Sequence, residues 1–139
     1  MVDFRYIFFG EHLGNDPTDL DSTFPFVGFQ SSVKSFEIPG QPVEGYFLVG
    51  VRDLQTKHTR TLINGQHIQH QSIEPGGEQY HVWFCDIERG MLVHGTNTIQ
   101  FLSGDDTRSD NFEIWQVVVH WRDQADKDGV ESSGEGYQY

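Results

Sequence analysis

The chain contains the stretch Thr61-Leu62-Ile63-Asn64-Gly65-Gln66-His67-Ile68, in which two apolar segments flank an Asn-Gly pair. Asn followed by Gly is favoured in two-residue hairpin turns, because both central residues of such a turn need positive φ angles. The stretch therefore predicts two antiparallel strands joined by a tight turn. Among the local patterns of this sequence, the hairpin is the clearest sign of a β-sheet protein.

Outward from the hairpin, short β-branched and aromatic runs recur between Gly, Pro and Asn residues. No segment of helical length has apolar residues at spacings of three and four, so we expect at most one or two short helical turns. Eight strands are predicted, near residues 4–9, 35–38, 46–53, 58–63, 66–69, 79–86, 96–102 and 112–121. Eight short strands favour an all-β fold, an antiparallel two-sheet jelly-roll sandwich.

The predicted strand at residues 46–53 indicates part of the core. Its alternate residues Phe47, Val49 and Val51 are expected to face inward, because successive side chains of a strand point to opposite faces. Arg52 then lies on the opposite face. Gly50 within this strand predicts a bulge or a close approach by another group.

The last predicted strand, residues 112–121, is apolar on both faces in its middle. This pattern is typical of a strand that is central or covered on its second side. Alternation predicts that Trp115, Val117, Val119 and Trp121 share one face and contribute to the core.

The 139 residues and 16.0 kDa correspond to one domain of ordinary size, predicted to span residues 1–122. Residues 123–139 lose this periodicity and form an acidic Gly/Ser-rich tail. Tyr137 and Tyr139 end the tail and would project from one side of an extended chain, so we expect them to contact a partner. An ordinary solubilising tail is the alternative.

The formal net charge is −12, with only nine Lys and Arg residues against 21 Asp and Glu. Binding to phosphate backbones or anionic membrane surfaces needs clustered positive charge, so nucleic acid is not expected as a partner, and neither is membrane insertion. Solubility is the simplest explanation of the acidic balance. A basic partner or a salt-rich habitat is also compatible with it.

A single cysteine, Cys85, excludes an internal disulfide and a multi-cysteine zinc site, and its apolar surroundings predict a small buried residue. Residues 1–9 contain an early acid and no small-residue cleavage site, so no signal peptide is predicted. No stretch approaches the roughly 20 apolar residues of a membrane helix. We expect synthesis in the cytoplasm, with a virion or other particle open as the final location.

Acidic residues suggest one candidate metal site. The segment 14–21 gathers Asp16, Asp19 and Asp21, whose carboxylates are the hard oxygen ligands that calcium prefers, although the spacing is not that of an EF-hand. A second acidic turn spans residues 104–110, and both turns are also compatible with simple solvation. No cofactor is required, and structural calcium is the one metal that the sequence suggests.

Four histidines, at positions 58, 67, 70 and 81, do not favour a further metal site. His67 and His70 lie three residues apart and would point to opposite faces of a strand, unlike paired ligands on a helix. Surface and hairpin histidines explain the pattern.

Catalysis lacks its usual motifs. There is no Gly-x-Ser-x-Gly elbow and no Gly-rich phosphate loop, and the one cysteine lies in the middle of a predicted strand. Asp53 and Asp86 form the type of acid pair that glycosidases use, but such pairs are common in so acidic a chain. A non-enzyme is predicted, and a glycoside-active enzyme is the least favoured alternative.

Aromatic residues near strand ends are the candidates for ligand binding. The rings of Tyr46, Tyr80 and Trp83 are able to stack on sugar faces or anchor a protein partner. Core packing is favoured for Trp83, and it is weighed evenly against ligand contact for Tyr46 and Tyr80. Arg52, expected on the face opposite the core, completes the predicted ligand-binding set.

The order of elements from Val43 onward resembles the galactose-binding-domain-like jelly rolls, which occur as carbohydrate-binding modules beside glycoside hydrolases. The resemblance rests on the hairpin at Asn64-Gly65 and on the later pattern Leu92-x-x-Gly95-x-Asn97-x-Ile99-x-Phe101. It extends to the stretches 46–51, 82–87 and 112–121. Gly95 permits a tight turn, and the Asn97 side chain is suited to satisfying backbone groups there.

The resemblance implies a binding module, because proteins of this fold bind glycans, other proteins or lipid head groups, and some carry a structural calcium near the first loops. It carries over no ligand-binding residue. We predict a non-catalytic interaction module that docks onto a larger assembly, such as a virion or appendage, through a protein partner or as a homo-oligomer. A carbohydrate-binding, lectin-like module is the alternative.

Overall fold

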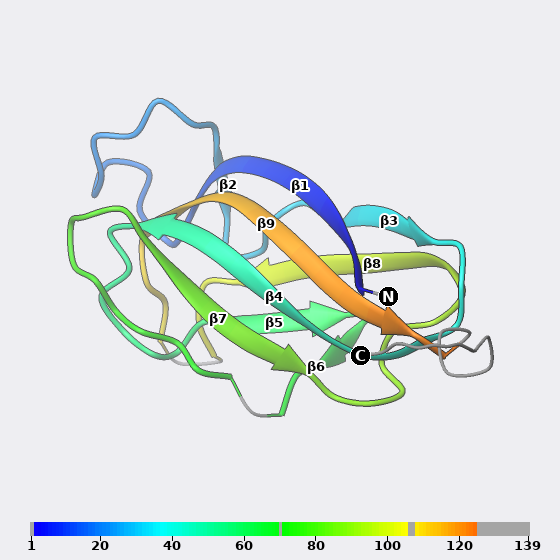
Figure 1. Ribbon diagram of the computed structural model, residues 1–139. Coiled ribbons are helices and arrows are strands. Elements are labelled where there is room, and N and C mark those ends of the chain that lie inside the picture. The colour runs from blue at the N-terminus through cyan, green and yellow to red at the C-terminus, as the bar shows by residue number, and fades with distance from the viewer. Residues whose placement is uncertain (1, 70, 106–107, 125–139) are drawn as a thin grey trace.

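The computed structural model describes residues 2–69, 71–105 and 108–124, which form a sandwich of two β-sheets (Figure 1). The front sheet of Figure 1 has the strand order β2-β1-β9-β4-β7, and the back sheet has the order β3-β8-β5-β6. The described strands are β1 (Val2–Leu13), β2 (Phe26–Gly28), β3 (Lys34–Ile38), β4 (Pro42–Arg52), β5 (Arg60–Ile63), β6 (Gln66–His67), β7 (His81–Ile87), β8 (Gly95–Leu102) and β9 (Phe112–Asp123).

The all-β sandwich is confirmed, with nine strands among the described residues instead of eight. The additional strand is β2, which has three residues and pairs in parallel with the end of β1. So short a strand has no room for a periodic pattern. No helix in the described part of the chain is long and apolar enough to cross a membrane.

The core lies between the sheets. Phe47, Val49 and Val51 are fully buried on the inner face of β4, as predicted. The Phe47 ring packs edge-to-face against Trp83 of β7 and Phe101 of β8, with centroid distances of 5.9 and 6.0 Å. Edge-to-face pairs of this kind suit the ring quadrupoles and join the two sheets.

Strand β9 is central, as predicted, because it pairs with β1 on one side and with β4 on the other. The prediction that Trp115 shares a face with Val117 is wrong. The β4–β9 register shifts between Gly50 and Val51, so Ile114 takes the inner position and is fully buried. One extra residue in a strand reverses the faces beyond it.

The predicted hairpin joins β5 to β6. Asn64 and Gly65 have φ angles of 52° and 78°, and Ile63 pairs with Gln66 across the turn. The Asn64 amide donates to Asn97 Oδ1 at 2.9 Å, which ties the turn to β8. Asn97 is itself fully buried and accepts from the Val93 N–H, so it satisfies backbone groups as expected.

Cys85 is buried on the inner face of β7, as predicted. Burial raises the pKa of its thiol to about 11, because the thiolate would lose its hydration. Tyr137 and Tyr139, predicted as partner contacts, lie outside the described residues, as does nearly all of the predicted tail.

Candidate ligand-binding face

The outer face of the front sheet carries side chains from β1, β9, β4 and β7. The pairing registers align them in three rows across the strands. We call this surface the ring face, and it comprises Phe4, Tyr6, Phe8, Tyr46, Leu48, Val82, Phe84, Gln116, Val118 and His120. None of these residues is an acid, a lysine or an arginine, and the one acid in the three rows is the exposed Asp86 of β7, which lies opposite Tyr46.

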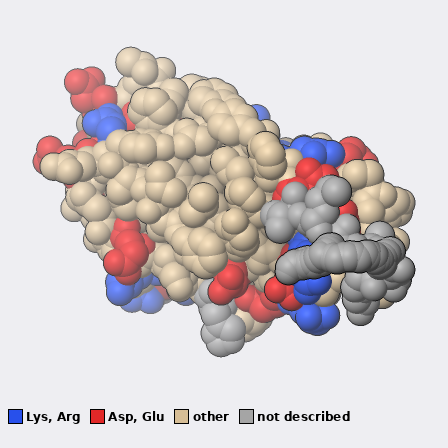
Figure 2. Space-filling model, in the orientation of Figure 1, with Lys and Arg blue, Asp and Glu red and all other residues tan. Residues whose placement is uncertain are grey.

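The ring face is accessible as well as apolar. Phe4, Tyr6 and Phe8 on β1 are 56%, 60% and 55% exposed, and Val82 and Phe84 on β7 are also exposed. Figure 2 shows a broad area without charged side chains over these strands, with Lys, Arg, Asp and Glu at its borders. A contiguous exposed apolar patch on a chain of net charge −12 indicates a binding surface.

Rings from all four strands form a continuous line across the ring face, in which Phe84 lies diagonal to Tyr46 because its partner on β4 is Leu48. The His120 ring lies 4.6 Å from that of Tyr46 at an interplanar angle of 8°, and 5.8 Å from that of Phe4. Tyr46 in turn contacts Phe84 at 5.0 Å. Because adjacent strands lie about 4.8 Å apart, a ring on each of four strands brings neighbouring rings into contact.

A pocket of about 200 Å³ adjoins this line of rings at Tyr46. Its lining includes the polar side chains Glu44, Asp86 and Arg122. The Arg122 guanidinium donates to Glu44 Oε1 at 3.1 Å, and Arg89 contacts the same oxygen at 3.3 Å. The line of rings therefore adjoins charged hydrogen-bonding groups.

Tyr80 borders the ring face near the other end of the sheet. Its ring passes over Gly50, and the Gln116 amide donates to its hydroxyl. The ring also packs edge-to-face on Trp115, which itself packs edge-to-face with Phe24. The predicted close approach at Gly50 is thus confirmed, because a Cβ there would overlap Tyr80 and Gln116.

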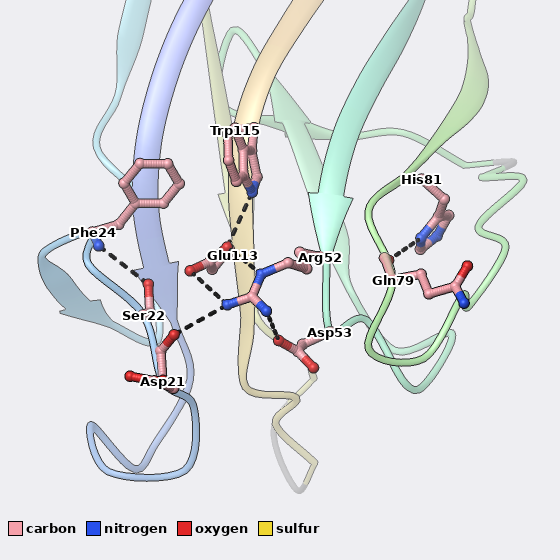
Figure 3. A network of polar contacts seen from close by, with 9 residues as sticks. All are labelled: Asp21, Ser22, Phe24, Arg52, Asp53, Gln79, His81, Glu113 and Trp115. Atoms are coloured by element: carbon pink, nitrogen blue, oxygen red, sulfur yellow. Dashed lines mark hydrogen bonds and ion pairs between the residues drawn. The ribbon is translucent and has the colours of Figure 1, made fainter.

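A polar network beneath Trp115 holds this end of the sheet (Figure 3). Arg52 Nε donates to Glu113 Oε1 at 2.8 Å, and the Trp115 indole N–H donates to the same oxygen at 3.0 Å. Arg52 also contacts Asp53 Oδ2 at 3.4 Å and donates to the carbonyl of Asp21 at 3.2 Å. Arg52 therefore positions Trp115 through Glu113.

The electrostatics of the network follow from burial and pairing. Burial of Glu113 opposes its ionisation, but the hydrogen bonds from Arg52, Ser22 and Trp115 outweigh this effect, so its pKa is lowered. The hydrogen bond to Glu113 also raises the pKa of Arg52. Burial raises the pKa of Asp53, and the positive charge of Arg52 offsets only part of this increase.

Residues 1–123 match a family described as being of unknown function, DUF7383. The chain belongs to this family. No curated protein matches the sequence.

Among solved structures, the chain is similar to the CBM36-1 domain of a multidomain xylanase from the hindgut metagenome of Trinervitermes trinervoides. The identity is 12%, the TM-score is 0.54, and the match covers 84% of this chain and 96% of that domain. A family 35 carbohydrate binding module from Clostridium thermocellum matches at 11% identity and a TM-score of 0.49, over 86% of this chain and 97% of the module. The galactose-binding-like sandwich expected from the sequence is confirmed as a fold.

The predicted ligand-binding residues have different fates in the structure. Tyr46 lies within the ring face, and Tyr80 borders it and is exposed. Trp83 is only 2% exposed, because alternation along β7 turns it inward between Val82 and Phe84, so its assignment to ligand binding is corrected to core packing. This chain's own carboxylates hold the Arg52 guanidinium, and its role in ligand binding stays a prediction.

Two aspartates of the predicted calcium loop, Asp16 and Asp19, make local contacts, whereas the Asp21 carbonyl accepts from Arg52. Asp16 Oδ1 accepts hydrogen bonds from the Thr18 hydroxyl and backbone N–H, which lower the pKa of Asp16. Asp19 donates its N–H to the Asp16 carbonyl. The described residues include no group of three or more His, Cys, Asp or Glu arranged to hold a metal ion. Calcium binding at this loop stays a prediction.

The acid pair weighed for glycosidase chemistry does not form. Asp86 lies opposite Tyr46, whereas Asp53 follows Tyr46 by seven residues along the chain, roughly 23 Å at the rise of a strand. Paired glycosidase carboxylates lie about 5–10 Å apart. These two acids therefore cannot act on one glycosidic bond.

Proposed function

We propose that this protein is a non-catalytic carbohydrate-binding module and that the ring face holds a neutral glycan. The observation that carries the proposal is the line of rings Phe4, His120, Tyr46 and Phe84, which crosses four strands and adjoins a polar pocket at Tyr46. Aromatic faces bind the apolar C–H faces of sugars, while polar groups at the border bind hydroxyls.

The polar groups around the line of rings suit hydroxyl-rich ligands. The hydroxyls of Tyr6 and Tyr46 and the His120 imidazole donate or accept hydrogen bonds, and Asp86 in the adjoining pocket adds a carboxylate acceptor. Lys and Arg are absent from the ring face itself. A neutral glycan therefore fits better than an acidic one, because the background charge of −12 repels anions.

The size of the ring face also favours a glycan. Four strands at about 4.8 Å and three rows at about 6.7 Å span roughly 400 Å². A stable protein–protein interface takes about 800 Å² from each partner. The ring face alone is about half of that, an area suited to a short oligosaccharide.

The shared fold with a domain of a xylanase supports this proposal over an enzymatic role. Docking onto a larger assembly is the second candidate, favoured by the exposed aliphatic residues Val82 and Val93, which add contact area without stacking on sugars. A further location for a ligand is a polar cavity of about 690 Å³ beside the back sheet, lined in part by Lys57, Arg60 and His67.

A glycan array with the full-length chain, followed by calorimetry on each bound glycan, tests the proposal. We expect Tyr6→Ala and Tyr46→Ala each to weaken binding about tenfold, since one stacked ring contributes roughly 1–2 kcal/mol. Phe29→Ala is the matched control, because Phe29 is an exposed ring outside the ring face. Arg60→Ala probes the second cavity.

Two results would contradict the proposal. The first is an array on which no neutral glycan binds. The second is binding that survives both tyrosine substitutions and is lost in Arg60→Ala, which would move the site to the back sheet. Co-purification of a protein partner that is lost in Tyr6→Ala, without glycan binding, would support the docking alternative.

A further inference from the structure

Strand β1 has one unpaired edge. One side of β1 pairs with β9 from Val2 to Leu13, whereas the other side pairs with β2 only at His12 and Leu13. Among the described residues, no strand pairs with this second side over residues 3–8. Figure 1 shows β1 along the border of the front sheet. At Phe4 the backbone N–H donates to Asp3 Oδ1 at 3.0 Å and the C=O accepts from Arg5 at 2.9 Å, so a partner strand here has to replace these two local bonds.

This edge carries the charged residues Asp3 and Arg5 but lacks the other features that normally prevent strand pairing. Residues 3–8 contain no Pro and no Lys, and the register shift of β1 comes only after Phe8. Native proteins usually protect an exposed edge with such residues or with a bulge. The rings of Phe4, Tyr6 and Phe8 are also more exposed than Tyr46 and His120, which have a strand on each side. An additional strand beside β1 would give these three rings cross-strand neighbours.

We propose that the additional strand is β1 of a second copy of this chain, paired antiparallel with Phe4 on the two-fold axis. A two-fold interface must be self-complementary, so each contact occurs twice. Centring on Phe4 places Asp3 opposite Arg5 of the second copy, and Arg5 opposite its Asp3. These are the only charged residues among residues 1–10.

Within one chain Arg5 lies 4.0 Å from Asp3, and only the Phe4-centred register adds a contact of opposite charge with the second copy. Centring on Arg5 places two guanidinium groups opposite each other, which destabilises a strand pair. Centring on Tyr6 places both arginines opposite Ile7 and leaves the aspartates without a cation across the axis. The Asp3 and Arg5 side chains are 40% and 39% exposed, so both are accessible to a second copy.

The dimer joins the two front sheets edge to edge and places their ring faces side by side. This inference does not depend on what the ring face binds. Strand pairing over so few residues gives a small interface, so we expect the dimer to dissociate on dilution, with a Kd on the order of 1–100 µM.

Sedimentation velocity of the full-length chain over a concentration series tests the proposal. The wild type is expected to shift from monomer to dimer, and Asp3→Arg and Arg5→Asp each to remain monomeric. The double variant Asp3→Arg/Arg5→Asp restores the opposite-charge contacts and is expected to dimerise again. Arg89→Glu is the control, because it reverses the charge of an exposed arginine whose partner Glu44 lies on β4.

A disulfide test examines the register. Phe4→Cys is expected to form a covalent dimer under mild oxidation, because residue 4 of one copy faces residue 4 of the other. Phe8→Cys is not expected to do so, because residue 8 does not face residue 8 of the second copy in this register. The native Cys85 is buried and does not compete. Arg5 also lies over the Trp121 ring, so Arg5→Asp is able to disturb the fold. Circular dichroism must therefore show that each variant is folded. If Arg5→Asp is unfolded, Asp3→Arg alone tests the charge contacts.

A wild type that stays monomeric at ~1 mM overturns the proposal. So does a dimer that both charge reversals leave unchanged. Cross-linking through Tyr6→Cys instead of Phe4→Cys would likewise overturn it, because that result requires a register without the Asp3–Arg5 contacts.

Discussion

The His120 ring lies between those of Tyr46 and Phe4, nearly parallel to Tyr46 and tilted by 29° from Phe4. Each of the three rings belongs to a different strand, and β9 contributes the central one. His120 therefore joins the exposed rings of β1 to those of β4. The integrity of the row depends on this one imidazole.

We expect the Tyr46–His120 stack to contribute measurably to stability. In a double-mutant cycle with Tyr46→Leu and His120→Leu, the coupling free energy of unfolding should be about 0.5–1.5 kcal/mol, because leucine keeps apolar bulk but removes the stacking. Urea denaturation measures it. The control cycle pairs Phe8→Leu with His120→Leu, two rows apart, and should be additive. Coupling in the control as large as in the test pair would refute this assignment.

Asp110 is expected to stabilise the segment that follows β4 through hydrogen bonds and not through its charge. The buried Asp110 Oδ2 accepts from the N–H groups of Gln55 and Thr56 at 2.8 and 2.9 Å. Asp110→Ala should therefore cost about 2–3 kcal/mol of unfolding free energy. Asp110→Asn retains an acceptor and should cost less.

The same residue predicts a pH dependence. Burial raises the pKa of Asp110, which its hydrogen bonds from Gln55 and Thr56 only partly offset. A carboxyl whose pKa is higher in the folded than in the unfolded protein stabilises the fold at pH values below its unfolded pKa of ~3.9. This stabilisation is lost as the pH rises through the pKa of the folded state. Asp110→Asn should therefore become more stable relative to wild type between about pH 3 and pH 7. A difference that is constant with pH would contradict this explanation.

Glu113 predicts the opposite trend. Its pKa is lowered, so its contribution is present above the ordinary glutamate value of ~4.3 and is lost as the pH falls through the lowered folded value. Glu113→Gln should lose about 1–3 kcal/mol at pH 7, a range that allows for the partial exposure of Arg52. The loss should shrink in acid. Denaturant titrations of both proteins at pH 3 and pH 7 measure it, and a loss that grows in acid would exclude the Arg52 pairing as its cause.

Features encoded in a few neighbouring residues were predictable from the sequence. Asn64-Gly65 fixes the hairpin through its own backbone preferences, and the alternation of Phe47, Val49 and Val51 identifies the inner face of β4. Trp115 was assigned to the wrong face because the bulge beside it depends on pairing with β4. A bulge set by a distant strand leaves no local pattern.

The candidate site was only partly predictable for a related reason. Tyr46 was identified, but the rings of β1 were not, because Phe4, Tyr6 and Phe8 alternate with the equally apolar Ile7 and Phe9. When both alternate sets are apolar, the sequence does not indicate which set the second sheet covers. The same ambiguity leaves both a core position and a ligand-binding position open for Trp83 on β7.

Gly50 predicts how tightly Tyr80 is held over the sheet. A Cβ at this position would overlap the Tyr80 hydroxyl and the Gln116 amide, which lie over the residue and hydrogen-bond to each other. Gly50→Ala should therefore cost about 1–3 kcal/mol of unfolding free energy, because the overlap displaces Tyr80 and breaks that bond. Tyr80→Ala removes the obstructing ring, so adding Gly50→Ala to it should cost clearly less than adding it to wild type. Thermal or urea denaturation of the four proteins measures this difference. If Gly50→Ala costs the same in both backgrounds, the requirement for glycine arises from Gln116 or from the bulge and not from Tyr80.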